Sequence, residues 1–154
     1  MSSLICTNTA ERLGPVMIDR DLTEKKLAFI ETAVRELQTL ARPERIEDDV
    51  REERFVAHTL QLAIQAALDV ASHLVSDLRL GEPETNRELF ELLGKGIDLP
   101  LELAETLEKM AGFRNILVHG YQALDLRIMR HVVEHNLDDL LAFVDVVRKG
   151  SETQ

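Results

Sequence analysis

Four polar side chains that could carry out chemistry lie within eight residues of the chain. They are Arg114, Asn115, His119 and Tyr121, and Tyr121 is the only tyrosine. Arginine has a permanent charge and a planar fork of donors that matches phosphate oxygens. Histidine titrates near neutrality and can move a proton either way. Together these residue types suit cleavage of RNA, in which the ribose 2′-OH attacks the adjacent phosphorus and no metal-activated water is required.

The spacing of the arginine and the histidine poses a geometric problem. Five residues turn an unbroken α-helix by about 500°, so Arg114 and His119 would point roughly 140° apart. Either the helix breaks between them, or the arginine reaches around it, or each residue works with groups of a second subunit. Asn115 and His119 can share a face because they are four residues apart. A structural alternative is also open, with Arg114 paired to a scaffold carboxylate and His119 capping helix carbonyls.

The rest of the chain must position these groups, and its pattern is helical. Apolar residues recur every three or four positions, and no strand pattern or internal repeat is present. We expect helices at about Asp21–Ala41, from the charged stretch Glu44–Arg54 to Leu80, at Asn86–Leu93, Pro100–Ala111 and Leu126–Lys149. The predicted fold class is therefore all-α, an up-and-down bundle of four to five helices. The second of them is apolar almost all round, which predicts a central or interface position.

Local signals predict where these helices begin and end. Two pairs have capping-box spacing, Asp21 with Glu24 and Thr85 with Glu88, and Asp125 can cap the last helix. Proline or glycine is expected to end or loosen a helix at Pro43, Gly94–Gly96, Gly112, Gly120 and Gly150.

The chain reads as one domain of 154 residues. Residues 1–18 are predicted to be a flexible N-terminal tail, in which Met17 is a second candidate start, residues 19–149 the helical domain, and 150–154 a polar end. The single cysteine, Cys6, excludes an internal disulfide and fits a reducing compartment. No apolar run approaches the roughly 20 residues that span a bilayer, and no signal peptide is apparent. We expect a cytoplasmic protein without membrane contact.

The formal charge of −10 argues against binding nucleic acid through bulk electrostatics. It leaves room for a nuclease with one local basic cleft, for a partner that completes such a surface, or for an acidic face that serves solubility or protein contacts. The mixed-charge run from Glu44 to Arg54 predicts a solvated face, from which Arg51 or Arg54 could reach RNA in a dimer. No binding of DNA is expected.

A second histidine pattern is a weaker candidate. The segment from His131 to His135, with Glu134, fits the H-x-x-E-H pattern of some zinc proteases. Those enzymes need a further carboxylate ligand well downstream, and here the sequence ends within 20 residues. We therefore expect a solvated helix face, no metal site and no cofactor.

The polar stretch resembles a known family motif. FRNILVHGY at 113–121 resembles the Arg-x4-His-x-Tyr motif of HEPN-domain ribonuclease toxins, in the HepT-like branch of the HepT/MntA systems. The resemblance extends to AIQAALDVASH at 63–73, to the helix after Pro83 that contains Phe90–Leu93, and to MAGFRN at 110–115. It covers residues 19–149.

The resemblance implies a fold and a mechanism. Proteins of this family are helical bundles that dimerise so that two motifs line one cleft, and they are metal-independent RNA endonucleases that leave a cyclic phosphate. By position, Arg114 would hold the phosphate, His119 would be the general acid/base, and Asn115 would orient the pair. Asp69 matches an acidic position of the family's second helix and is a candidate supporting residue.

The resemblance also implies a partner. The family's antitoxin is a minimal nucleotidyltransferase that transfers AMP to the motif tyrosine, here Tyr121, in a type VII-like toxin–antitoxin system. A nucleotide on Tyr121 would place negative charge and bulk beside Arg114 and His119, where the substrate phosphate should bind. Two other readings remain open: a non-catalytic HEPN module that binds a nucleotidyltransferase or a nucleotide, and a structural helical adaptor.

Overall fold

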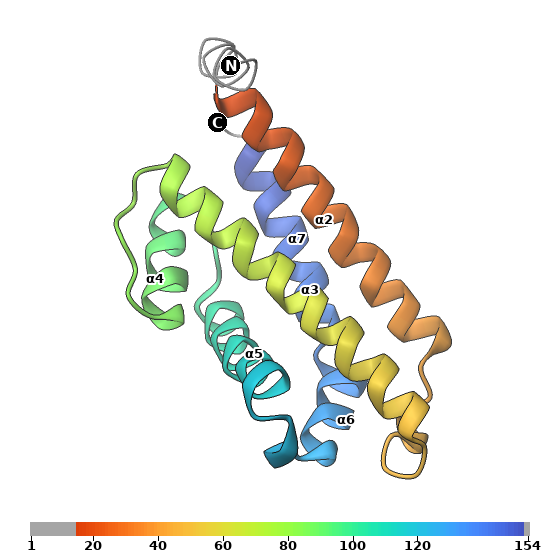
Figure 1. The fold of residues 1–154 in the computed structure, drawn as a ribbon. Helices are drawn as coiled ribbons and strands as arrows, with labels where there is room; N and C mark the ends of the chain where they lie inside the picture. Colours follow the sequence, from red (N-terminus) through yellow and green to blue (C-terminus); the bar gives the residue numbers. More distant parts are fainter. Residues whose placement is uncertain (1–14, 153–154) are drawn as a thin grey trace, which may run out of the picture.

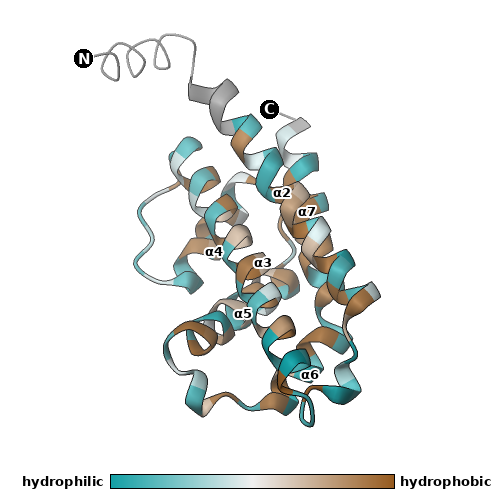
Figure 2. Cartoon of the chain, turned by 45° about the vertical axis from the view of Figure 1, so that its right-hand side comes forward, coloured by the Kyte–Doolittle hydropathy of each residue, from teal (hydrophilic) through white to brown (hydrophobic). Residues whose placement is uncertain are grey.

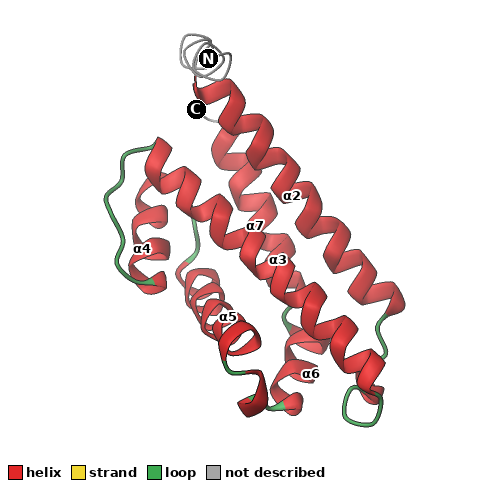
Figure 3. Ribbon diagram, in the orientation of Figure 1, coloured by secondary structure: helices red, strands yellow, loops and turns green. Residues whose placement is uncertain are grey.

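The chain folds as a bundle of α-helices in the computed structural model, which describes residues 15–152 (Figures 1 and 3). The α-helices are α2 (Pro15–Leu40), α3 (Val50–Asp77), α4 (Asn86–Gly96), α5 (Leu101–His119), α6 (Leu126–His135) and α7 (Leu137–Glu152). Two 3-10 turns, η1 (Pro43–Arg45) and η2 (Tyr121–Ala123), lie between them. The predicted all-α class is confirmed. The described residues form six α-helices rather than four or five, and this range contains no strand.

Helix α3 is the centre of the bundle. It runs antiparallel to α2 and also packs against α4, α5, α6 and α7 (Figure 1). Its buried positions include a run of alanines, which let neighbouring helices approach closely: Ala57, Ala63, Ala66, Ala67 and Ala71. The sequence prediction of a central second helix is confirmed. In Figure 2 hydrophobic and hydrophilic residues alternate along the helices, as expected of helices that bury one side.

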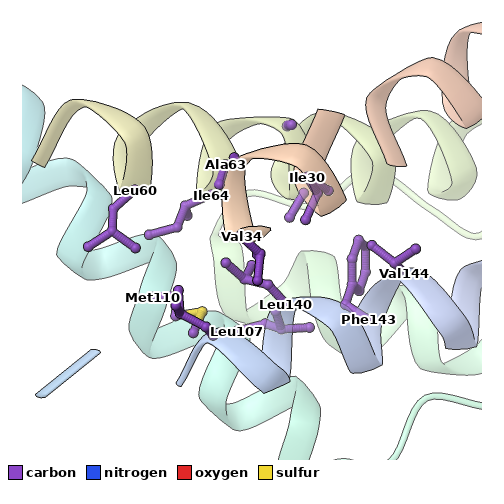
Figure 4. Close-up of a cluster of buried hydrophobic side chains, with 14 of the residues drawn as sticks. Ile30, Val34, Leu60, Ala63, Ile64, Leu107, Met110, Leu140, Phe143 and Val144 are labelled. Atoms are coloured by element: carbon purple, nitrogen blue, oxygen red, sulfur yellow. The ribbon is translucent and has the colours of Figure 1, made fainter. Parts of the chain in front are cut away.

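The core is built mainly from aliphatic side chains, and all six described α-helices contribute to it. Figure 4 shows the cluster in which Ile30 and Val34 of α2 meet residues of α3, α5 and α7. Burying each such side chain stabilises the fold by roughly 1.5–3 kcal/mol. Helix α5 contributes a stripe at helical spacing, and this stripe anchors the helix that carries the polar motif: Leu103, Leu107, Met110, Phe113 and Leu117. The motif therefore stands on a fixed element.

Side-chain caps mark several helix starts. The backbone N–H of Glu88 donates to Thr85 Oγ1 at 3.1 Å, so the predicted cap of α4 is confirmed. Asp125 caps α6 as predicted, by accepting from the backbone N–H of Arg127 at 2.9 Å. The capping box predicted at Asp21 is wrong. Helix α2 already begins at Pro15, so Asp21 lies inside it and pairs with the next turn instead.

Glycines predicted some helix ends and not others. Gly120 follows α5 and α4 ends at Gly96, as expected, but Gly112 and Gly150 lie within helices. A glycine inside a helix costs only about 1 kcal/mol relative to alanine, and tertiary packing can supply more than that. A Cβ on Gly96 would lie 2.6 Å from Leu80 Cδ1, and one on Gly150 would lie 2.9 Å from Ile97 Cγ2. The missing side chains of these two glycines therefore permit close packing.

Three predicted boundaries also differ from the structure. The last helix is divided at Asn136, whose side chain donates to Asp139 Oδ2 at 2.9 Å and begins α7 as a separate helix. The predicted tail, residues 1–18, lies mostly outside the described residues, but its last four belong to α2. Helix α7 continues to Glu152, beyond the expected stop.

Candidate active site

Helix α5 carries Arg114, Asn115 and His119 without a break. It is α-helical from Leu101 to His119 and ends in front of Gly120, whose N–H donates to Ile116 O. The option of a broken helix is therefore excluded. On a regular helix the arginine and the histidine point about 140° apart.

Arg114 has no carboxylate partner among residues 15–152. Its Nη1 donates to Asn115 Oδ1 at 3.0 Å, and its Nε is buried without a hydrogen-bond partner in that range. A buried donor that lacks an acceptor costs about 1–3 kcal/mol. The structural alternative, an arginine neutralised by a bundle carboxylate, is therefore wrong. The guanidinium therefore has a donor that no described residue uses.

Asn115 is the polar neighbour that holds the arginine. It is exposed, and its amide oxygen accepts the bond from Arg114 Nη1. The orienting role of Asn115 stays a prediction. The side chain makes no hydrogen bond to His119 in the described part of the chain.

His119 is the last residue of α5 and is exposed to solvent. Its side chain forms no hydrogen bond to any described residue, and the helix end is closed by backbone groups of Gly120 and Ile116 instead. The alternative in which His119 caps the helix carbonyls is therefore wrong. Its imidazole is free to meet a substrate or a second subunit.

Two apolar side chains near the motif are exposed. Ile116 is 42% exposed and Val118 is 36% exposed. On a regular helix they point about 200° apart, one on each side of the buried Leu117, so they flank the buried stripe and do not form a separate outer face. Gly112 is exposed on the same helix, and a Cβ added there would meet no atom within 4 Å. Gly112, Ile116 and His119 follow one another at spacings of four and three residues, so they share one face of α5.

Tyr121 lies in η2 and contacts the first turn of α3. Its hydroxyl donates to Glu53 Oε1 at 3.1 Å. Burial raises the pKa of Tyr121 above its usual value, and the hydrogen bond to Glu53 and the charge of that carboxylate raise it further. Arg54 acts on the pKa in the opposite direction. The hydroxyl is therefore held as a neutral phenol.

Glu53 is a site residue that sequence reasoning missed. It belongs to the charged run that was predicted to be solvated, yet it is half-buried and 68 positions away from the tyrosine that it binds. No spacing rule links residues so far apart. In the same run, Arg51 and Arg54 are exposed as predicted.

Asp69 lies away from these groups within one protomer. Its carboxylate pairs with Lys26 Nζ of α2 at 3.1 Å and accepts from Gln65 Nε2 at 2.8 Å. It stands 16 residues after Glu53 on α3, which corresponds to about 24 Å along the helix axis. The structure brings Arg114 and Asn115 together and seats Tyr121 on Glu53, but it does not bring Asp69 to the motif.

The second histidine pattern lies on an exposed face of α6, as predicted. The rings of His131 and His135 are tilted, with centroids 4.6 Å apart, and Glu134 is engaged by Arg130 at 3.3 Å. Among the described residues no three histidine, cysteine or acidic side chains are arranged to hold a metal ion.

None of the described helices combines the length and hydropathy required to cross a membrane.

Comparison with known proteins identifies the family. The family model described as "Ribonuclease HepT-like" matches residues 30–147. The mRNA nuclease HepT of Shewanella oneidensis is 34% identical over 129 residues, which cover 83% of this chain and 97% of that protein. The tRNA nuclease HepT of Aphanizomenon flos-aquae is 46% identical over 66 residues, 43% of this chain and 45% of that protein.

Solved structures agree with this relationship. The tri-AMPylated HEPN toxin of Shewanella oneidensis in complex with its MNT antitoxin has a TM-score of 0.76 at 34% identity, with 84% of this chain and 98% of that chain covered. The Bacillus subtilis protein YutE has a TM-score of 0.79 at 19% identity over 88% of this chain and 92% of its own, which shows the fold alone. On the strength of the family match and of the relatives that span nearly its whole helical domain, this chain belongs to the ribonuclease HepT-like family of HEPN proteins.

Proposed function

We propose that this protein is a metal-independent endoribonuclease, the toxin of a type VII-like toxin–antitoxin system. The observation that carries the proposal is Arg114, a guanidinium with no carboxylate partner and a buried unpaired Nε. It lies on the same helix as the exposed His119. Relatives of this chain that are named mRNA and tRNA nucleases support the reaction class. Because such RNAs are cytoplasmic, the enzyme would act in the cytoplasm.

His119, Arg114 and Asn115 have separate roles in the proposed reaction. The ribose 2′-oxygen forms a bond to phosphorus while the bond to the 5′-oxygen breaks, which leaves a 2′,3′-cyclic phosphate and a free 5′-hydroxyl. His119 moves the proton as general acid/base. Arg114 binds the non-bridging oxygens and stabilises the negative charge that develops on them. Asn115 holds the guanidinium through its amide oxygen.

A homodimer solves the geometric problem of the motif. Arg114 and His119 of one protomer diverge by about 140° on a regular helix, so an arginine and a histidine that act on the same phosphate need a second copy of the motif. The exposed Ile116 lies on the same face of α5 as Gly112 and His119 and is an apolar side chain that such a contact would bury. Gly112 would let the two α5 helices approach closely, because no side chain stands between them.

Local positive charge would bind RNA although the net charge is −10. Arg114 provides charge in the cleft, and the exposed Arg51 and Arg54 lie at the end of α3 that contacts Tyr121. Two copies of this set around one cleft would double the number of cations. RNA binding of this kind weakens as salt is raised.

The proposed partner is a minimal nucleotidyltransferase that neutralises the toxin by transferring AMP to Tyr121. This position follows the histidine by two residues, as in the family motif, and a relative has been solved in a tri-AMPylated state with its antitoxin. A phosphodiester-linked nucleotide at Tyr121 would bring negative charge and bulk next to the cleft. It would compete with the substrate phosphate for Arg114. The alternative, a non-catalytic module that binds a nucleotidyltransferase or a nucleotide, is favoured only by the acidic net charge.

The proposal is tested by RNA cleavage with the purified chain. The wild-type protein should cleave RNA in the presence of EDTA and leave cyclic phosphate ends, detected by mass spectrometry of the fragments. The His119→Ala variant should lose cleavage by about 10²–10⁴-fold, because proton transfer is lost. The matched control is His131→Ala, which removes an exposed histidine of α6. A folded, dimeric and unmodified wild-type protein that leaves RNA intact would refute the ribonuclease function.

A further inference from the structure

The contact between Tyr121 and Glu53 joins the proposed AMP acceptor to a carboxylate of another element. The phenolic oxygen lies 3.1 Å from Glu53 Oε1 and donates its proton into this bond. Both side chains are half-buried. Glu53 stands in the first turn of α3, whose N-terminus is fixed by the Asp49 cap. The carboxylate is therefore positioned on a rigid element at the one atom that AMP transfer must modify.

The chemistry of AMP transfer requires a base at this atom. An unperturbed phenol, with a pKa of about 10, is ionised to only about one part in a thousand at pH 7. Burial and Glu53 raise the pKa of Tyr121 above that value, so even less phenolate exists in the folded protein. A neutral phenol is a poor nucleophile toward phosphorus, and its proton must leave as the new bond forms. A base within hydrogen-bond reach has the geometry for this role.

We propose that Glu53 is the general base that takes the proton of Tyr121 when the tyrosine is modified, an inference that rests on the proposed transfer of AMP to this residue. The co-substrate is a nucleoside triphosphate held by the partner nucleotidyltransferase. The Tyr121 oxygen forms a bond to the α-phosphorus, the bond from that phosphorus to the oxygen bridging to the β-phosphate breaks, and pyrophosphate leaves. The phenolic proton passes to the Glu53 carboxylate. The toxin thus supplies part of the machinery for its own neutralisation.

The charged neighbours leave the Glu53 carboxylate available. Arg130 of α6, which packs against this end of α3, pairs with Glu47 at 3.7 Å instead. Arg54 is adjacent on α3, and its charge lowers the pKa of Tyr121 against the larger effects of burial and Glu53. Among the described residues, Tyr121 is the only one whose side chain hydrogen-bonds to the Glu53 carboxylate.

The test measures AMP incorporation by the partner nucleotidyltransferase from ATP, followed by intact mass over a range of pH. In Glu53→Gln the amide oxygen can still accept the hydrogen bond but cannot take the proton. We expect the rate near pH 7 to fall by about 10²–10⁴-fold. The ratio of variant to wild-type rate should rise with pH, as phenolate becomes available without a base. The matched control is Glu44→Gln, which makes the same change at an exposed position in η1 and should match wild type.

Two other outcomes would overturn the assignment. A Glu53→Gln rate equal to wild type at every pH would exclude Glu53 as the base, and a loss that is constant with pH would show that it only positions the tyrosine. If Glu53→Gln does not fold, Glu53→Ala with added acetate replaces it: acetate should restore the rate in proportion to its concentration, and the absence of restoration would contradict the proposal. The Tyr121→Phe variant tests the AMP acceptor separately from the base. AMP incorporation that survives in Tyr121→Phe refutes the proposed acceptor itself, whatever the Glu53 variants do.

Discussion

Two arginines of this bundle have opposite environments. Arg148 of α7 is held by two carboxylates of α2, with Nη2 at 2.6 Å from Glu24 and 2.7 Å from Glu31. These contacts raise the pKa of Arg148 and lower that of Glu31. Arg114 of α5 has one neutral neighbour and a buried Nε with no partner within the described residues. The scaffold pairs the first arginine with two carboxylates, whereas the second has no carboxylate partner among the described residues.

The same contrast appears in the glycines. Gly96 sits in a packed part of the scaffold, where an added Cβ would lie 2.6 Å from Leu80 Cδ1. Gly112 sits on the motif helix, where an added Cβ would meet open space. Arg148 and Gly96 have close neighbours in the bundle, whereas Arg114 has a buried Nε with no described partner and Gly112 faces open space. This difference is what a binding site built on a stable bundle requires.

The largest expected effect is a loss of RNA cleavage when Arg114, but not Arg148, is replaced. Arg114→Met should lower RNA cleavage by about 10²–10³-fold, because a donor to the developing charge is lost. It should not lower stability, since it also removes the unpaired Nε. Arg148→Met should leave cleavage intact. Cleavage assays and urea unfolding of both variants check this pattern, and equal losses of activity in the two would break the comparison.

Replacing Gly96 or Gly112 should give the next largest effects, on stability and on self-association. Gly96→Ala should destabilise the protein by about 1–3 kcal/mol, because the methyl group overpacks against leucine side chains. Gly112→Ala should instead raise the stability of the monomer by up to about 1 kcal/mol. It should weaken self-association if the α5 helices meet at this point. Thermal unfolding measures the stability of both variants, and sedimentation measures the self-association of Gly112→Ala.

The Arg148 cluster should be sensitive to acid. The folded-state pKa of Glu31 is lowered from 4.5, so its contribution is present above pH 4.5 and is lost as the pH falls through the folded-state value. Because these groups are about one third exposed or more, Arg148→Met should cost only about 1 kcal/mol at pH 7. The difference between variant and wild type should shrink below pH 4.5. A difference that is unchanged at pH 3 in urea titrations would contradict the assignment to this ion pair.

The smallest effect is expected at Asp69. Its partners are Lys26 of α2 and Gln65 of its own helix, so Asp69→Asn should lower stability by less than about 1 kcal/mol. RNA cleavage should be unchanged, because the residue lies far along α3 from the motif. A cleavage defect in Asp69→Asn, with normal unfolding, would instead show that a second protomer brings this carboxylate to the cleft.

Local patterns in the sequence were sufficient for much of the fold. Apolar spacing predicted the helices and the central position of α3, and the caps at Thr85 and Asp125 formed as their side-chain chemistry predicts. Gly112 and Gly150 did not interrupt their helices, because the cost of one glycine in a helix is smaller than the packing energy around it. Asn136 divides the last helix through a hydrogen bond to Asp139 that periodicity does not detect.

The sequence by itself determined that Arg114, Asn115 and His119 share one segment and that Tyr121 follows them, because these relations are local. Only the tertiary structure decided that α5 is continuous, that Arg114 has no carboxylate partner in the described chain, and that Tyr121 donates to Glu53. The physical reason is sequence separation. A hydrogen bond across 68 positions depends on how helices pack, and packing is set by the whole core rather than by any local pattern.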